Sequence, residues 1–419
     1  MKSWKANFAA LLAAQILAMI GFGLSFPVIP LFLEEDIGIT DPVQLRAWVG
    51  LIQSTAAITM AIFAPIWGHL ADVFSRRAML LRSMFGGALV ISLMTFVNSP
   101  WQFLVLRGIQ GCLTGTVAAA TVLVAAISPP AQVAFALGLL TTGIAVGNSL
   151  GPLVGGVISD FLGYRAAFFS TGLCLALSGA IVLKWVDSDK KPLSEQIDEV
   201  TVPVVPQEES QKKQGKKITF IPDFRPIAAS PVLITIMLIA FGIQVANGVA
   251  IPMLPLFLKE LVLRASEEPM FIASSTGIVL GVGAAFSALA AVLVGKFSLR
   301  IGYWKTLIFC LAAGAFVTIP QTFVTNMYQL MALRAVSSFF IGGAAPIINA
   351  IIAISAEKKI QGAAFGFNSS ISAAGMALGP MIGSAVAILN LRAVFIMASL
   401  ILGFSAWMCA RRRKMGLEN

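Results

Sequence analysis

Twelve apolar stretches, each long enough to cross a lipid bilayer as a helix, limit the fold of this chain more than any other feature. About 20 apolar residues cross the hydrocarbon core as an α-helix, because a helix keeps its backbone hydrogen bonds within the segment. Hydrophobic residues make up 58% of the sequence and charged residues only 11%. The sequence therefore predicts an all-α membrane protein. The predicted spans are 8–33, 47–68, 79–97, 102–125, 134–158, 165–186, 231–258, 270–294, 305–322, 327–352, 361–386 and 391–410.

A polar segment at 188–230 separates these spans into two sets of six, and its Lys, Glu, Pro and Gln content is typical of a flexible linker. We therefore divide the chain into an N-terminal half (1–187), the linker (188–230), a C-terminal half (231–410) and a basic tail (411–419). Lysines and arginines gather at the termini, in the linker and in the loops on their side, so the positive-inside rule places both termini in the cytoplasm. The net charge of +10 thus reflects topology, and nucleic-acid binding is not expected.

Two classes of chemistry are excluded by residue counts. The chain has one histidine, His69, and four cysteines that lie in apolar runs without the spacing of metal ligands. Neither a metal site nor a Ser-His-Asp site is expected, and nothing else in the sequence indicates an enzyme. A sensor would normally carry an added signalling domain.

The two halves resemble each other at a nearly constant spacing. The stretch PVIPLFLE at 27–34 recurs as PMLPLFLK at 252–259, and GNSLGP at 147–152 recurs as GMALGP at 375–380. Six spans per half preserve the orientation of the second copy, so the repeat is parallel. Parallel repeats are related by an axis along the membrane normal, with the substrate site between them near the midplane. This predicts two six-helix bodies that rock about a central site, as in a transporter.

The stretch GHLADVFSRR at 68–77 resembles the cytoplasmic loop signature of the major facilitator superfamily, although positions 73 and 75 depart from it. We expect it to form the loop after the second span, with a tight turn at Gly68 and with Asp72 near the start of the third span. The resemblance implies a conformational latch, made of Gly68, Asp72, Arg76 and Arg77.

Two further stretches resemble motifs of the same superfamily. The first, LVLRGIQG at 104–111, is similar to its span-four motif and places Arg107 about 9 Å into the helix at 1.5 Å per residue. A charge at that depth has to face a polar cavity or a partner, and Arg334 repeats the geometry in the second half. The second, GNSLGPLVGG at 147–156, is similar to the span-five motif of the drug:proton antiporter branch. Its residues are Gly147, Gly151, Pro152, Gly155 and Gly156.

The resemblance covers nearly the whole chain and implies a secondary active transporter that exports small drug-like or amphipathic compounds in exchange for protons. Within that branch the chain is most similar to MdtG-type multidrug resistance proteins, in stretches such as WQFL at 101–104 and RAVF at 392–395. The resemblance implies a monomer in the bacterial inner membrane that uses the proton gradient and no cofactor. Its partners would be a small-molecule substrate, protons and the bilayer, and the two arginines favour anionic substrates.

Proton coupling requires a group that changes its protonation, and the acids of this chain fall in loops, tails or span ends. Our hypothesis is that Glu34 exchanges a proton and a partner with Arg107, and a solvated acidic loop is the alternative. The candidate cavity residues are Arg107, Gln110, Arg334, Glu34, Gln53, Gln244 and Asn247. Two other functions fit the same fold: a flippase for lipids or lipid-linked sugars, and an importer of organic anions or siderophores.

Overall fold

The computed structural model describes residues 4–73, 75–129, 132–187, 230–264, 271–356 and 360–414. Within these residues twelve helical segments have the length and apolar composition to cross a membrane, and no strand is present. The predicted all-α fold with twelve spans is therefore confirmed. The predicted linker, except for Ser230, and the last five residues of the tail lie outside the described residues.

The elements follow the order of the predicted spans, and several helices extend beyond them. They are α1 (Trp4–Ser25), α2 (Ile29–Glu35), α3 (Pro42–Val73), α4 (Arg76–Leu93), η1 (Met94–Phe96), α5 (Pro100–Leu113), α6 (Thr116–Ile127), α7 (Val133–Leu162), α8 (Tyr164–Trp185), α11 (Pro231–Ala250), η3 (Ile251–Met253), α12 (Leu254–Arg264), α13 (Ile272–Ile301), α14 (Tyr303–Thr318), η4 (Ile319–Phe323), α15 (Met327–Ser355), α16 (Gln361–Leu389) and α17 (Ala393–Lys414).

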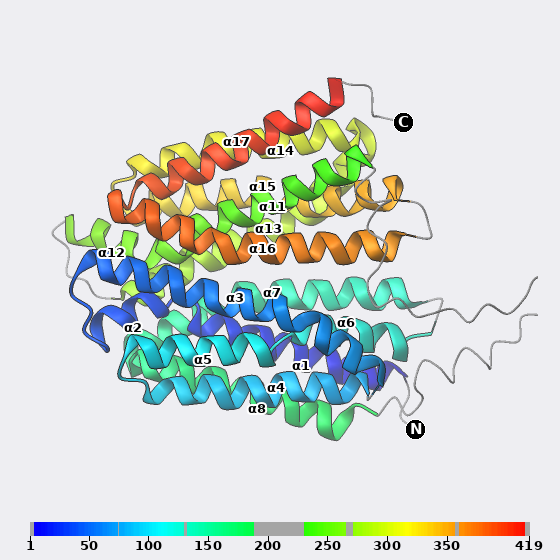
Figure 1. The fold of residues 1–419 in the computed structure, drawn as a ribbon, viewed down its shortest axis with the longest axis horizontal. Helices are drawn as coiled ribbons and strands as arrows, with labels where there is room; N and C mark the ends of the chain where they lie inside the picture. Colours follow the sequence, from blue (N-terminus) through cyan, green and yellow to red (C-terminus); the bar gives the residue numbers. More distant parts are fainter. Residues whose placement is uncertain are drawn as a thin grey trace, which may run out of the picture.

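Two helical bodies lie side by side, the N-terminal half in blue to green and the C-terminal half in green to red (Figure 1). Both chain termini lie at the same end of the bundle, which we call the terminal end. The opposite end, where α2 and α12 lie, is called the far end. The halves contact each other mainly through two helix pairs, α7 with α13 and α3 with α16, and also where α3 meets η3 and α2 meets α12.

The first span of each half is broken, although a single helix was predicted for each. A turn separates α1 from α2 at residues 26–28, and the 3₁₀ segment η3 separates α11 from α12. Pro27 and Pro252 lie at these breaks, and a proline has no N–H with which to continue the helical ladder. The breaks set α2 and α12 at the far end as short, separate helices.

The fourth span is also broken, which the sequence analysis did not predict. It divides into α5 and α6 at Gly115, whose φ of 134° is readily adopted only by glycine. The break frees two carbonyl groups at the end of α5, and both find donors: Trp67 Nε1 binds the Cys112 oxygen at 2.6 Å and Arg82 Nη1 binds the Leu113 oxygen at 3.1 Å. The equivalent span of the second half, α15, runs unbroken.

The internal repeat extends to the hydrogen bonds that cap the N-termini of α5 and α15. Ser99 begins α5 by accepting a hydrogen bond from Gln102 N, and Asn326 begins α15 by accepting one from Gln329 N. In return, the Gln102 side chain accepts a hydrogen bond from Asn98 N at 3.0 Å. The second half repeats this return bond between Gln329 and Thr325 N, also at 3.0 Å. Both are reciprocal capping arrangements, which explains why Gln102 recurs as Gln329 at the equivalent position of the second half.

In each half, an arginine at the equivalent position contacts a backbone carbonyl and a phenylalanine ring of the same half. Arg165 donates to the Thr95 carbonyl at 2.7 Å, and Arg392 donates to the Thr322 carbonyl at 3.1 Å. Each guanidinium also lies beside a phenylalanine of the broken first span, with Cζ to ring-centroid distances of 5.6 and 5.7 Å. These contacts fix α8 and α17 within their own halves, so each half is a packed body.

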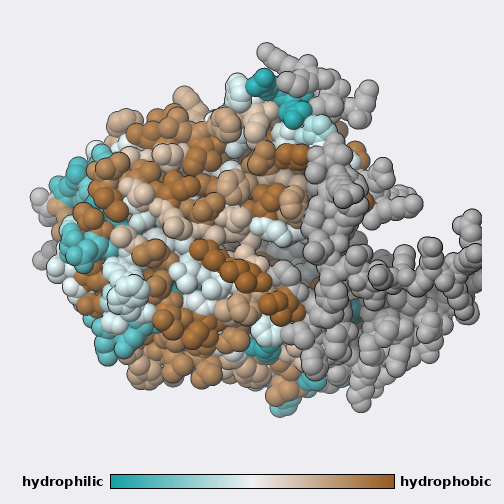
Figure 2. Space-filling model, viewed as in Figure 1, coloured by the Kyte–Doolittle hydropathy of each residue, from teal (hydrophilic) through white to brown (hydrophobic). Residues whose placement is uncertain are grey.

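The flank of the bundle is apolar, as expected of a surface in contact with lipid. Large exposed hydrophobic side chains include Leu89, Phe96, Phe316 and Leu400. In the face that Figure 2 shows, hydrophobic residues cover the middle and hydrophilic residues gather at the far end. Lipid contact removes the need for a polar surface along this flank.

Candidate transport site and gate

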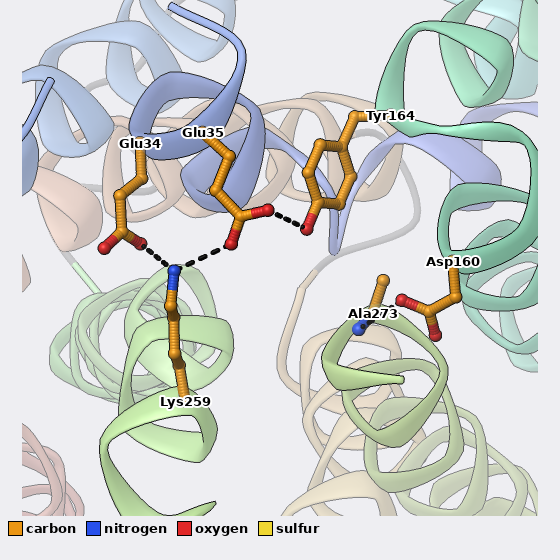
Figure 3. A network of polar contacts seen from close by, with 6 residues as sticks. All are labelled: Glu34, Glu35, Asp160, Tyr164, Lys259 and Ala273. Atoms are coloured by element: carbon orange, nitrogen blue, oxygen red, sulfur yellow. Dashed lines mark hydrogen bonds and ion pairs between the residues drawn. The ribbon is translucent and has the colours of Figure 1, made fainter. Parts of the chain in front are cut away.

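The far end of the bundle is closed by charged contacts between the halves. Lys259 of α12 lies 3.1 Å from Glu34 and 2.7 Å from Glu35, both at the end of α2 (Figure 3). Tyr164, at the start of α8, donates a 2.8 Å hydrogen bond to Glu35. These side chains are between partly buried and exposed, so water screens the pairs and each adds little stability alone. Together they fasten the first span of one half to that of the other.

Lys259 is absent from our predicted site, although the sequence contains a signal for it. Glu34 and Lys259 occupy equivalent positions in the repeat, 27–34 against 252–259, and they carry opposite charges. Equivalent residues beside a twofold axis face each other, so this pair is expected to meet. The structure does not bring Glu34 to Arg107, because each of them binds other partners. The hypothesis of an exchange between the two stays a prediction.

Small residues allow the halves to meet closely below these charges. A Cβ atom added to Gly156 of α7 would overlap the backbone of Ala273 in α13, with 2.7 Å to the carbonyl carbon. A Cβ added to Gly277 of α13 would meet the Pro152 carbonyl of α7. At the other helix pair, Gly50 of α3 lies equally close to α16. Substituents at these positions would hold the halves apart.

The remaining glycines of the span-five motif face α1 within the N-terminal half. A Cβ added to Gly151 would lie 2.6 Å from the Cα of Gly23, and one added to Gly147 would lie 2.5 Å from the Cβ of Met19. Gly155 is in similar contact with Leu24. Pro152 lies inside the unbroken α7. The motif therefore contributes to two helix contacts. The contact with α1 involves Gly147, Gly151 and Gly155, and the contact with α13 of the other half involves Gly156.

Arg107 forms the buried polar centre of the N-terminal half. Its side chain is only 9% exposed and donates to Gln110 Oε1 at 2.8 Å and to Gln53 Oε1 at 2.6 Å. Both acceptors are neutral amides, and within the described residues no carboxylate forms an ion pair with this guanidinium. The positive charge is thus hydrogen-bonded and uncompensated. The structure brings together three of the predicted cavity residues here.

Arg334 is the equivalent residue of α15, and its environment is different. It is 6% exposed, and its guanidinium forms no hydrogen bond or ion pair within the described part of the chain. The sequence gives the reason: the positions equivalent to Gln53 and Gln110 are Leu280 and Ser337. A buried charge without a partner is unfavourable, so this guanidinium is the better placed of the two to receive an anion.

The other predicted cavity residues lie on α11. Gln244 and Asn247 are half-buried, and neither forms a side-chain hydrogen bond with another described residue. A Cβ added to Gly375 of α16 would lie 2.9 Å from the Cβ of Gln244, so this glutamine packs at the α11–α16 contact. Nothing in the described part of the structure joins these two residues to Arg107.

The predicted loop at 68–77 is a helix for most of its length, so that prediction was wrong. The helix α3 continues to Val73, so Gly68 makes no turn and Asp72 lies in the last turn of α3 instead of at the start of the third span. A helix end beyond the apolar run can remain helical because its backbone bonds stay satisfied within the segment. The surroundings of Gly68 and the side chain of Asp72 lie outside the described part of the structure.

The described bonds of Arg77 stay within the N-terminal half. Its Nη2 donates to the Leu183 carbonyl at 2.5 Å, in the last turn of α8, where a cation is favoured by the helix dipole. Arg76, at the first position of α4, precedes it. A latch made of Gly68, Asp72, Arg76 and Arg77 therefore remains a prediction.

The sequence profile of the Major Facilitator Superfamily matches residues 11–323 and 236–416. The chain belongs to this superfamily. Multidrug resistance protein MdtG of Salmonella paratyphi A is 31% identical over 421 residues, which cover 99% of this chain and 98% of that protein. MdtG of Proteus mirabilis is 32% identical over 404 residues, which cover 96% and 94%. The resemblance inferred from the motifs is thereby confirmed.

Solved transporters of the superfamily share the fold at much lower identity. A bacterial homologue of the human lysosomal transporter Spinster, in an inward-facing and occupied conformation, has a TM-score of 0.76 at 14% identity and covers 99% of this chain and 98% of its own. A mutant of the nucleoside transporter NupG has a TM-score of 0.73 at 14% identity, with coverage of 97% and 99%. The superfamily fold makes this chain a multi-pass membrane transporter, with its substrate site expected between the halves.

Proposed function

We propose that this chain exports small amphipathic compounds, anionic ones among them, from the bacterial cytoplasm in exchange for protons. The two halves rock about a central site and expose it to each side in turn. The name of the relatives, multidrug resistance protein, supports a drug-like substrate. The observation that carries the anionic class is the pair of buried guanidinium groups of Arg107 and Arg334, which have no ion-pair partner among the described residues.

The closed far end supports the direction of loading. Lysines and arginines are concentrated at the terminal end, and the positive-inside rule then assigns that end to the cytoplasm. Five hydrogen bonds and two ion pairs between described residues of the two halves lie at the far end and hold that end closed. A site between the halves would then be closed towards the periplasm, which supports loading from the cytoplasm, where an exporter takes up its substrate.

The test uses everted membrane vesicles that contain the full-length chain and a fluorescent ΔpH probe. After energisation, we would add an amphipathic anion such as deoxycholate, and in a second series a lipophilic cation such as ethidium. We expect proton release on addition of the anion. A response to cations alone would contradict the anionic class, and no response to either would contradict proton-driven export and favour a flippase or an importer.

Removal of Arg334 should weaken this response strongly. We expect Arg334→Ala to raise the half-saturating anion concentration about 30-fold or more, since loss of one partner of a buried charge pair typically costs about 2–5 kcal/mol. Arg300→Ala is the matched control, because Arg300 is an exposed arginine at the terminal end of α13. Unchanged half-saturation in Arg334→Ala would show that this guanidinium does not bind the anion.

Stability should distinguish the two arginines in the absence of substrate. Arg107→Ala leaves the Gln53 and Gln110 amides without their shared donor, and we expect a loss of about 1–3 kcal/mol in unfolding free energy. Arg334→Ala removes a guanidinium that has no partner among the described residues, so its unfolding midpoint should stay level or rise. Thermal unfolding of the purified proteins in detergent measures both. Equal losses in the two variants would contradict this difference.

A further inference from the structure

The two helix pairs that join the halves are related by the internal repeat. Pro152 of α7 corresponds to Pro380 of α16, and Gly277 of α13 corresponds to Gly50 of α3. In both pairs the glycine lies against the carbonyl of the proline in the other half. The two contacts thus share their small-residue packing, and any difference between them comes from the residues further towards the far end.

At the α7–α13 contact, a carboxylate of one half caps a helix of the other. Asp160, near the end of α7, accepts hydrogen bonds from Ala273 N at 3.2 Å and Ser274 N at 2.7 Å (Figure 3 draws the first). These N–H groups belong to the first turn of α13, which has no acceptor within its own helix. The residue before α13, Phe271, has a φ of 65° and provides no side-chain cap. Asp160 takes the place of an N-cap residue.

At the α3–α16 contact, a positively charged side chain takes the place of the carboxylate, and it binds the C-terminus of a helix instead of the N-terminus. The residue equivalent to Asp160 is Ile388, which cannot accept a hydrogen bond, and the residue equivalent to Ala273 is Arg46. Arg46 Nη1 donates to the Ala387 carbonyl at 2.8 Å, in the last turn of α16. Ser384 Oγ completes the contact by donating to the Arg46 carbonyl at 2.5 Å. A cation here binds a helix C-terminus.

We infer that Asp160 and Arg46 are paired gate residues that hold the far end closed. Each is a charged side chain of the N-terminal half that binds the end of a helix in the C-terminal half. A carboxylate at a helix N-terminus and a cation at a C-terminus are both favoured by the helix dipole. Neither bond can survive when the halves separate at this end, so both oppose opening. They act as positioning residues, since neither binds the substrate. From the proposed function, the inference assumes only that the two halves separate at the far end during the transport cycle.

The experiment measures opening without any substrate, using the full-length chain in nanodiscs so that both faces are accessible. The reporter is Leu31→Cys, in a background in which Cys112, Cys174, Cys310 and Cys409 are replaced by serine. Leu31 is fully buried and packs against Ile272 and Ala273 of the other half. A maleimide therefore labels this position only after the far end opens.

We expect Asp160→Ala to raise the labelling rate about 5- to 30-fold, as for the loss of a helix cap that carries charge. Asp160→Asn, which keeps an acceptor oxygen, should give a smaller rise. Arg46→Ala should also accelerate labelling, and the double variant should multiply the two effects because the contacts are separate. Thermal unfolding of each variant identifies any that is misfolded. If Asp160→Ala is misfolded, the labelling rate of Asp160→Asn tests the inference in its place.

The matched control is Asp36→Asn. Asp36 is an acid at the same end whose 3.4 Å ion pair with Arg165 lies within the N-terminal half. Its loss should leave the labelling rate unchanged. Parental labelling rates in the folded Asp160 and Arg46 variants, or an equal rise in Asp36→Asn, would overturn the inference. Because no substrate or proton gradient is used, this outcome is independent of whether the chain exports anions.

Discussion

Replacing Gly156 with leucine should abolish transport and leave the chain folded in the membrane, whereas the same change at Gly155 should reduce folding itself. A side chain at position 156 would project into the Ala273–Ser274 backbone of the opposite half, with 2.7 Å from Cβ to the Ser274 Cα. The halves can avoid this overlap by staying apart, so the far end remains open. A side chain at position 155 meets the Leu24 backbone of α1, 2.5 Å from its Cα, and packed helices within one half cannot separate without unfolding.

Three measurements distinguish these outcomes: thermal unfolding, proton-coupled transport and labelling of the Leu31→Cys reporter. For Gly156→Leu we expect a parental unfolding midpoint, no transport and fast labelling. For Gly155→Leu we expect a loss of stability at or above the roughly 1–3 kcal/mol typical of an overpacked core, because the obstacle is backbone. Transport by Gly156→Leu at the parental rate would show that the α7–α13 contact is not part of the cycle.

Reversal of one charge at the far end should open the molecule, and a second reversal should partly close it again. Lys259→Glu places a third carboxylate beside Glu34 and Glu35, where the ammonium now lies within 3.1 Å of both. Allowing for solvent screening of these exposed groups, the repulsion destabilises the closed end by on the order of 1–2 kcal/mol. We expect about a tenfold rise in labelling of the Leu31→Cys reporter, since about 1.4 kcal/mol corresponds to a factor of ten.

The charge-swapped double variant, Glu34→Lys with Lys259→Glu, provides the control. The exchange recreates the ion pair between positions 34 and 259 with its charges interchanged, while the new carboxylate at 259 still lies beside Glu35. The labelling rate should fall clearly below that of Lys259→Glu but stay above the parental value, because Glu35 still repels the new carboxylate and salt screens that repulsion only in part. Failure of the swap to slow labelling below the rate of Lys259→Glu would indicate that Lys259 acts through packing instead of charge.

The sequence was sufficient for the number of spans and for the superfamily, because apolar length and motifs are properties of the chain alone. It was not sufficient for the breaks. The break at Gly115 depends on donors from Trp67 and Arg82, which are distant in sequence and become neighbours only in the fold. The helical continuation of α3 through Gly68 was missed because the end of an apolar run was taken as the end of the helix.

For the candidate site, too, the sequence predicted some features and missed others. Depth within a span identified Arg107 and Arg334 as unusual, but only packing shows that the first is held by two glutamines and the second is not. The motif at 147–156 was found from the sequence, yet sequence periodicity could not tell which of its glycines meets the other half. Asp160 belongs to the acids that the sequence placed only in loops, tails or span ends, because a cap on a helix 113 residues away leaves no local pattern.

The break in the fourth span makes the two halves mechanically unequal. Its counterpart α15 is a single rod, whereas α5 and α6 meet at a glycine joint whose free carbonyls are held by two side chains of neighbouring helices. The fourth span of the N-terminal half therefore has a joint at Gly115, whereas its counterpart is one continuous helix with Pro346 inside it. In the proposed transport cycle, bending at this joint would let one half adapt to substrates of different bulk without disturbing the contacts that close the far end.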